Sequence, residues 1–289
     1  MTRLFGFIQF DFAGALAIAD GRYLVRDGGR EQVLVIETLG APPPARRRRK
    51  RPRGAEIGEP PPELPVARVT VVLAFNQLED EREAATWLQG TSNDEGAVDQ
   101  LIERGIDELN RALHAHAVAS GDPYPQTVTP ARAVVIRVGY GGGEALADGA
   151  FTSANRVDPG LGSISRRRQR DEELRPQQRL AAVLGGREQL DACETLLLRA
   201  RADLDAGRNR EAALQLRVGL EALLIELKGA FSDPDHDEDM AILESSRNKV
   251  GELANTALQG NLNATQLKAI RDTQAVCERV LRRRRVLGS

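Results

Sequence analysis

The chain changes its hydrophobic pattern once along its length, and this change constrains its fold more than any other feature. Before Tyr140 the apolar residues occur in short runs rich in β-branched side chains, such as Gln32 to Leu39, which indicate strands. After Pro159 they recur every three or four residues, which is typical of amphipathic helices. The length of 289 residues also exceeds the ~100–200 residues of a usual domain. We therefore predict two domains of different class.

Three strands are expected between Leu4 and Leu39, arranged as an antiparallel meander. The first has phenylalanines at alternate positions with a slip near Ile8, which indicates a bulge. Turn residues at Asp27–Arg30 place a hairpin between the other two strands. The apolar start of the chain also imitates a secretory signal, but Gln9 and Asp11 interrupt it, so we interpret it as a strand.

Four further elements complete the first predicted domain: a strand over 66–75, a helix over 79–88, a longer helix after Ser92 and a strand over 131–140. Ser92 and Glu95 have capping-box spacing at the start of the longer helix, and Gly121 is placed to end it. This order predicts one antiparallel or mixed sheet with helices packed on a face, the α+β class. We assign residues 1–152 to this domain.

Two segments have the composition of linkers. Residues 41–65 combine many prolines with basic residues, which predicts a disordered insertion in the first domain. A second basic linker is expected over residues 153–174.

Residues 175–289 are predicted to form an α-helical bundle, with helices over 176–184, 188–206, 209–230, 239–259 and 264–284. Gly207 and Gly260 are placed to end two of these helices. Asn263 and Gln266 have capping-box spacing for the last helix. The apolar residues of each helix form a stripe that the other helices can cover.

The stretch from Leu109 to Gly149 resembles a family of actinobacterial proteins. The resemblance extends over most of the chain outside the basic insertion, and it implies a bacterial cytosolic protein without carrying over any catalytic or binding residue. In the bundle, Leu196 to Leu223 resembles a tetratricopeptide-type hairpin, with small residues at Ala200, Ala202 and Gly219. No second copy follows, whereas a solenoid needs about three repeats.

The same hairpin is similar to the central hairpin of HEPN domains, helical bundles that include RNA-cleaving members. Those nucleases carry an arginine and a histidine six positions apart on a helix. Arg247, Arg271 and Arg279 have no histidine at that spacing. The resemblance therefore implies a shape and no catalytic residue.

Three clusters hold fifteen of the 40 Lys and Arg residues, so the remaining 25 basic residues stand against 42 acidic ones. The candidate polyanion-binding residues in these clusters are Arg46, Arg47, Arg48, Arg49, Lys50, Arg51, Arg53, Arg166, Arg167, Arg168, Arg282, Arg283, Arg284 and Arg285. Basic clusters on flexible segments can bind a polyanion, an acidic partner or the acidic body of the protein itself. The first cluster contains no aromatic residue, so any nucleic-acid binding would be weak, salt-sensitive and independent of sequence.

No arrangement in the sequence predicts a catalytic residue, a cofactor or a resident metal. His114 and His116 lie two apart on a predicted helix, so their side chains diverge by about 200°. The segment Gly139–Gly143 lacks the residues of a phosphate-binding loop and is interpreted as a strand exit. Cys193 and Cys277 are expected to be buried thiols in a reducing compartment.

The acidic stretch from Asp233 to Glu244 leaves one alternative open. Its carboxylates occupy positions one, three, five and twelve of a calcium-binding EF-hand loop, but Glu238 stands where that loop needs glycine. The same carboxylates would also suit the positive end of a helix that begins near Asp239.

These observations favour a cytoplasmic, non-enzymatic protein-interaction or regulatory module with an unidentified protein partner. No membrane association is expected, because no stretch approaches the ~18 consecutive apolar residues of a membrane span. The alternative is a sequence-independent nucleic-acid-binding protein that uses the arginine clusters.

Overall fold

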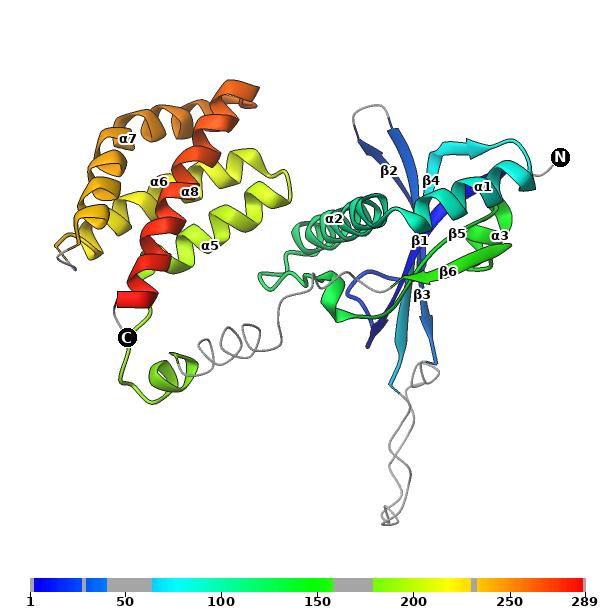
Figure 1. Cartoon of the computed structure of the whole chain (residues 1–289). Helices are drawn as coiled ribbons and strands as arrows, with labels where there is room; N and C mark the ends of the chain where they lie inside the picture. Colours follow the sequence, from blue (N-terminus) through cyan, green and yellow to red (C-terminus); the bar gives the residue numbers. More distant parts are fainter. Residues whose placement is uncertain (1–2, 28–29, 41–63, 158–178, 230–232, 288–289) are drawn as a thin grey trace, which may run out of the picture. The chain divides into compact units, whose positions relative to one another are not determined.

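The structure is a computed structural model that describes residues 3–27, 30–40, 64–157, 179–229 and 233–287 (Figure 1). The chain divides into two compact units, Met1–Gly162 and Ser163–Ser289, which we call the sheet unit and the bundle unit. The sheet unit combines an antiparallel sheet with helices, and the described elements of the bundle unit are helices. The predicted α+β class with a C-terminal helical region is confirmed.

One six-stranded sheet forms the sheet unit, with the strand order β2-β3-β4-β1-β5-β6. Its strands are β1 (Leu4–Ala13), β2 (Gly21–Asp27), β3 (Arg30–Leu39), β4 (Val66–Leu78), β5 (Ala133–Gly142) and β6 (Ser153–Val157). Every neighbouring pair is antiparallel. The β2–β3 hairpin is confirmed, but the predicted meander is wrong because β4 lies between β3 and β1. The strand β6 extends the sheet past residue 152, the predicted end of the domain, and occupies the start of the predicted linker over 153–174.

Residues 7–11 of β1 alternate between the two faces of the sheet without interruption, so the predicted slip near Ile8 is wrong. Ile8, Phe10 and Phe12 lie in the core beneath the helices, whereas Phe7 lies in a second cluster on the opposite face. The register irregularities occur next to Gly6 in the pairing with β4 and after Asp11 in the pairing with β5. Both faces of this central strand are therefore buried, which explains its high content of large apolar residues.

Two helices cover one face of the sheet, α1 (Glu81–Asn93) and α2 (Glu95–Ser120) (Figure 1). The N-cap of α2 is Asp94, whose carboxylate accepts a hydrogen bond from the Ala97 backbone, and not Ser92 as predicted. Ser92 instead belongs to α1, which runs five residues further than expected. Gly121 ends α2 in the left-handed conformation, as predicted.

The opposite face of the sheet is divided between an apolar and a polar part. Leu146 of the short helix α3 (Gly143–Ala147) packs there with Phe7, Val35 and Val72. The polar part surrounds Asp11 on the three central strands. This division positions a charged network on the sheet face that α1 and α2 do not cover.

The network around Asp11 is saturated with hydrogen bonds. Arg68 Nε donates to the Asp11 carboxylate at 2.9 Å, and Arg137 Nη1 donates to it at 2.8 Å. Gln9 Oε1 accepts from Arg137 at 3.0 Å, while Gln9 Nε2 donates to Thr70 Oγ1 at 2.9 Å. Burial alone would raise the pKa of Asp11, but the two guanidinium groups outweigh it and hold that pKa below its usual value. The network therefore ties β4, β1 and β5 together.

The bundle unit contains α5 (Ala192–Asp205), α6 (Asn209–Glu226), α7 (Pro234–Gln259) and α8 (Ala264–Leu287), and residues 179–184 are also helical. Leucine, alanine and both cysteine side chains form most of its core. Asn263 and Gln266 exchange two hydrogen bonds of 2.9 Å, which confirms the predicted capping box. Among the described helices, none is long and apolar enough to cross a membrane.

The α5–α6 hairpin only partly matches the expected packing of small residues. Ala200 is fully buried, and a Cβ atom on Gly219 would lie 2.9 Å from Leu197 Cδ2, so the helices approach closely there. Ala202, in contrast, is exposed. Its predicted place between the helices is wrong, since two residues along a helix turn a side chain to the far side.

Candidate functional site

The third arginine cluster lies in the last turns of α8 and is folded into the bundle. Arg283 forms ion pairs with Asp239 at 2.8 Å and with Asp235 at 3.5 Å. Arg284 pairs with Asp191, which immediately precedes α5. Such clusters were expected to bind a polyanion, an acidic partner or the acidic body of the protein itself. These two arginines bind carboxylates of the protein itself.

Most other residues of the three arginine clusters lie outside the described part of the chain. Arg282 is exposed, and the side chain of Arg285 lies outside the described residues. The clusters at Arg46–Arg53 and Arg166–Arg170 also lie outside the described residues. The structure therefore brings together only the C-terminal arginines, and it joins them to acidic groups on α7 and ahead of α5.

Asp239 is the centre of the ion pairs on α7. Arg279 binds its carboxylate through Nη2 at 2.7 Å and Nε at 3.0 Å, and Arg283 adds a third contact at 2.8 Å. Hydrogen bonds from Arg279 chiefly, and then from Arg283, lower the pKa of Asp239 against the opposing effect of burial. Arg279 and Arg283 are four residues apart, so they share one face of α8.

The EF-hand alternative for Asp233 to Glu244 is wrong, because no loop of that length exists. The helix α7 begins at Pro234, and Asp233 is its N-cap, accepting from the Asp235 backbone at 2.9 Å. Asp235 and Asp237 lie in the first helical turn. Their negative charges suit the positive end of the helix, which is the other interpretation of this acidic stretch.

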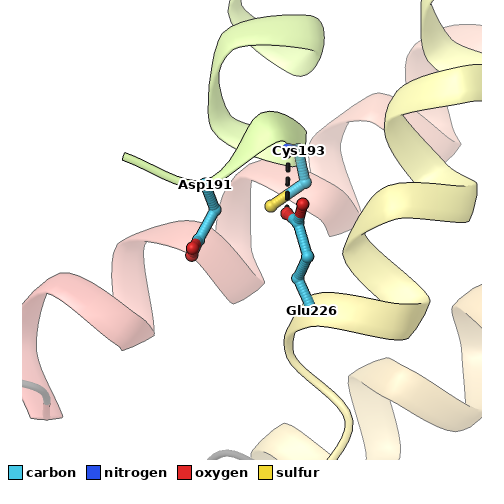
Figure 2. Close-up of side chains that lie close together, drawn as sticks. All are labelled: Asp191, Cys193 and Glu226. Atoms are coloured by element: carbon cyan, nitrogen blue, oxygen red, sulfur yellow. Dashed lines mark hydrogen bonds between the residues drawn. The ribbon is translucent and has the colours of Figure 1, made fainter. Parts of the chain in front are cut away.

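A group of possible metal ligands lies at the start of α5. Carboxylate oxygens of Asp191 and Glu226 and the sulfur of Cys193 lie within 4.8 Å of one another (Figure 2). The Glu226 carboxylate, however, accepts backbone hydrogen bonds from Ala192 at 3.2 Å and from Cys193 at 3.0 Å. It therefore caps α5, while Asp191 is paired with Arg284. This arrangement is explained by helix capping and ion pairing, and it does not suit a cation.

Neither cysteine is expected to react in the folded bundle. Both Cys193 and Cys277 are fully buried, and burial raises the pKa of each thiol to about 12, with Glu226 adding to the shift at Cys193. A maleimide at mildly alkaline pH should label neither residue in the native protein and both in urea, as measured by mass spectrometry. Rapid native labelling of Cys193 would contradict the cap arrangement.

The glycine-rich segment and the two histidines singled out in the sequence lie in ordinary strand and helix positions. A Cβ atom on Gly139 would lie 2.3 Å from the Ser153 carbonyl oxygen, so glycine is needed where β5 meets β6. The glycine-rich segment thus continues a strand rather than forming an anion cradle. His114 and His116 lie on α2, half-buried and exposed respectively.

A polar pocket of about 480 Å³ lies over α2, with Arg104, Glu108 and Gln32 among its lining residues. Gln32 Nε2 donates to Glu108 Oε1 at 3.2 Å, and both side chains are buried. This pair joins α2 to β3 at the edge of an otherwise apolar core. We assign it a structural role.

The strongest candidate surface is a second apolar face on α6. The inner face, Ala212, Leu216, Leu220 and Leu223, is at most 1% exposed. The outer face consists of Leu214, Val218, Ala222 and Ile225. Their spacings of four, four and three residues place them on one side of the helix. We call this set the outer face of α6.

The outer face of α6 is partly exposed among the described residues, and Ala222 at its side packs against the bundle core. Val218 is 54% exposed and Ile225 is 77% exposed, while Leu214 and Ala222 are half-buried. Neighbouring helices contact the other sides of α6, and Figure 1 shows α8 crossing it. The sequence pattern predicts one apolar stripe on each helix of the bundle, and the spacing of these four residues was a readable signal of a second stripe on α6.

Opposite charges lie at the two ends of the outer face. Glu211 lies one turn before Leu214, and Lys228 lies in the turn just after α6, three residues past Ile225; both are exposed. In the described part of the chain, neither forms an ion pair. Glu221, by contrast, is turned toward α7, where Arg247 Nη2 binds it at 2.6 Å. The middle of the face is therefore apolar and its ends are charged.

Comparison of the chain with protein-family models, curated proteins and solved structures finds no match. The resemblances to an actinobacterial family, to a tetratricopeptide-type hairpin and to HEPN domains therefore stay predictions.

Proposed function

We propose that the protein is a non-enzymatic protein-interaction module and that its bundle binds an amphipathic helix on the outer face of α6. The observation that carries this proposal is the exposure of Val218 and Ile225 on a helix whose opposite face is already buried. A helix that is apolar on both sides is normally covered on both sides. An exposed apolar stripe with a charged rim is also typical of a docking surface.

The chemistry of the expected partner follows from the charges at the ends. An antiparallel helix that places a cation beside Glu211 and an anion beside Lys228 would complement both ends of the face. Between them, leucine-like side chains would meet Leu214, Val218 and Ile225 at heptad spacing. The proposal is therefore specific for a helix with an apolar stripe and oppositely charged ends.

The alternative proposal is sequence-independent binding to nucleic acid. It now depends on Arg46–Arg53 and Arg166–Arg170, because Arg283 and Arg284 are paired with carboxylates. Its signature is a steep loss of binding as salt rises. The apolar outer face of α6 predicts the opposite behaviour, with little dependence on salt in the physiological range.

A designed helical peptide tests the interaction proposal directly. The peptide carries leucines at heptad positions, lysine opposite Glu211 and glutamate opposite Lys228, and its binding is followed by fluorescence anisotropy. Ile225→Lys should weaken binding at least about tenfold, because it places a charge in an apolar contact.

The matched control is Leu198→Lys, which changes a leucine of α5 that is 60% exposed but lies off the outer face of α6. This control should bind the peptide as the parent protein does. Failure of the peptide to bind, or equal losses in the two variants, would overturn the proposal.

A further inference from the structure

We infer that the helix occupying the outer face of α6 is α6 of a second copy of the chain, so that the protein forms a two-fold symmetric dimer. This inference rests on the proposed function and names the partner. A two-fold contact joins the same surface on both copies, so the surface must be complementary to itself. The outer face of α6 meets this requirement in an antiparallel arrangement.

The apolar residues of the outer face can pair with one another across the two-fold axis. When two α6 helices run antiparallel and cross between Gly219 and Leu220, Leu214 lies opposite Ile225 of the second copy, and the reverse pair also forms. Val218 then lies level with Glu221 of the second copy and one residue away from Ala222. The small Ala222 leaves room for Val218, so large side chains meet small ones at the centre.

The charges at the ends fit the same register. Glu211 of one copy lies opposite Lys228 of the other, and the symmetry produces this attractive pair twice. A parallel arrangement would instead set Glu211 against Glu211 and Lys228 against Lys228, which is repulsive. Because Arg247 holds Glu221 toward α7, no unpaired carboxylate stands at the centre of the contact.

The size of the surface sets the expected strength. The apolar contact consists of one helical stripe from each copy, which is small compared with the ~1,200–2,000 Å² buried in stable interfaces. We therefore expect a reversible dimer with a dissociation constant in the micromolar range. Sedimentation equilibrium of the full chain over a range of concentrations should show monomer and dimer.

A substitution on the outer face is present twice in each dimer, so it should shift the monomer–dimer equilibrium strongly. Ile225→Lys should raise the dissociation constant at least about thirtyfold, because each dimer then contains two buried lysines. Leu198→Lys, which lies off the face, should change it less than about threefold. A monomeric parent protein at all concentrations, or a dimer unaffected by Ile225→Lys, would overturn the inference.

Charge reversal tests the register. Glu211→Lys alone and Lys228→Glu alone should each weaken the dimer about tenfold, since each puts like charges together twice. A mixture of these two variants should recover a dimer that contains one copy of each, because both pairs then have opposite charges. Native mass spectrometry with one variant isotopically labelled detects this species. No recovery in the mixture would overturn the antiparallel register.

The outcome separates this inference from the proposed function. If the chain stays monomeric but the designed peptide binds and Ile225→Lys abolishes its binding, the interaction module stands and the second copy is excluded as its partner. If neither the peptide nor a second copy binds, both proposals fall.

Discussion

Replacing Asp11 with alanine is expected to destabilise the sheet unit by roughly 2–4 kcal/mol, the cost of breaking a largely buried ion pair with some allowance for exposure. The Asp11 side chain is 8% exposed, and those of Arg68 and Arg137 are each 24% exposed. Without the carboxylate, two guanidinium groups face each other on the central strands with no anion between them. Trp87, the chain's single tryptophan, packs against the core on the other face of the same sheet, so its fluorescence in a urea titration reports unfolding of the unit.

The control is Arg22→Ala, which breaks an ion pair with Asp148 whose side chains are 57% and 70% exposed. Such exposed pairs contribute less than about 1 kcal/mol. An Asp11→Ala variant as stable as this control would show that the network around Asp11 contributes nothing measurable.

The dependence on pH gives a second measurement of the same contact. The pKa of Asp11 in the folded protein lies below its usual value of 3.8. The stability that Asp11 contributes is therefore complete above that value and is lost as the pH falls through the lowered pKa. The difference in stability between the parent protein and Asp11→Ala should shrink as the solution is made more acidic.

Strands and helices could be predicted from periodicity, but the strand order could not. Alternating residues identify β1 as a strand, yet they do not show which strand lies beside it. The insertion of β4 between β3 and β1 depends on contacts between residues about sixty positions apart, such as Gln9 with Thr70. Local patterns contain no information about such pairing.

The role of the C-terminal arginines could have been predicted more closely. The run Arg282–Arg285 resembles the other basic clusters in composition, so we weighed it with them, although the helix predicted over 264–284 already contains Arg282 to Arg284. Arg279 and Arg283 are four residues apart, however, which places both on one face of a continuing helix. The acidic start of α7 supplies the carboxylates that they bind, notably Asp239.

The outer face of α6 illustrates a different limit of sequence analysis. The sequence of a leucine-rich helix shows that the helix is apolar. How many of its sides are covered depends on where the neighbouring helices lie. Leu220 and Ile225 are equally apolar in the sequence, and only the packing shows that Leu220 is 1% exposed and Ile225 is 77% exposed. The structure was therefore needed to identify this candidate surface, although the spacing of its residues can be read in the sequence.

Replacing Gly105 with leucine is expected to destabilise the sheet unit by about 3 kcal/mol, the upper end of the usual cost of overpacking. A Cβ atom on Gly105 would lie 2.7 Å from Phe10 Cε2 and 3.0 Å from Ile8 Cγ2. Both side chains are fully buried, so they have no solvent to move into. The larger side chain must therefore push α2 away from the sheet, which opens the core beneath it.

The matched control is Gly90→Leu on α1, where a Cβ atom would meet nothing within 4 Å. Because leucine favours a helix over glycine, this change should stabilise the unit by roughly 0.5–1 kcal/mol. Urea titrations followed by Trp87 fluorescence and by circular dichroism compare the two variants. If Gly105→Leu lowers the free energy of unfolding and Gly90→Leu raises it, the close approach of α2 to Phe10 requires glycine at position 105. If both substitutions change the free energy of unfolding in the same direction, α2 does not pack on β1 at this point.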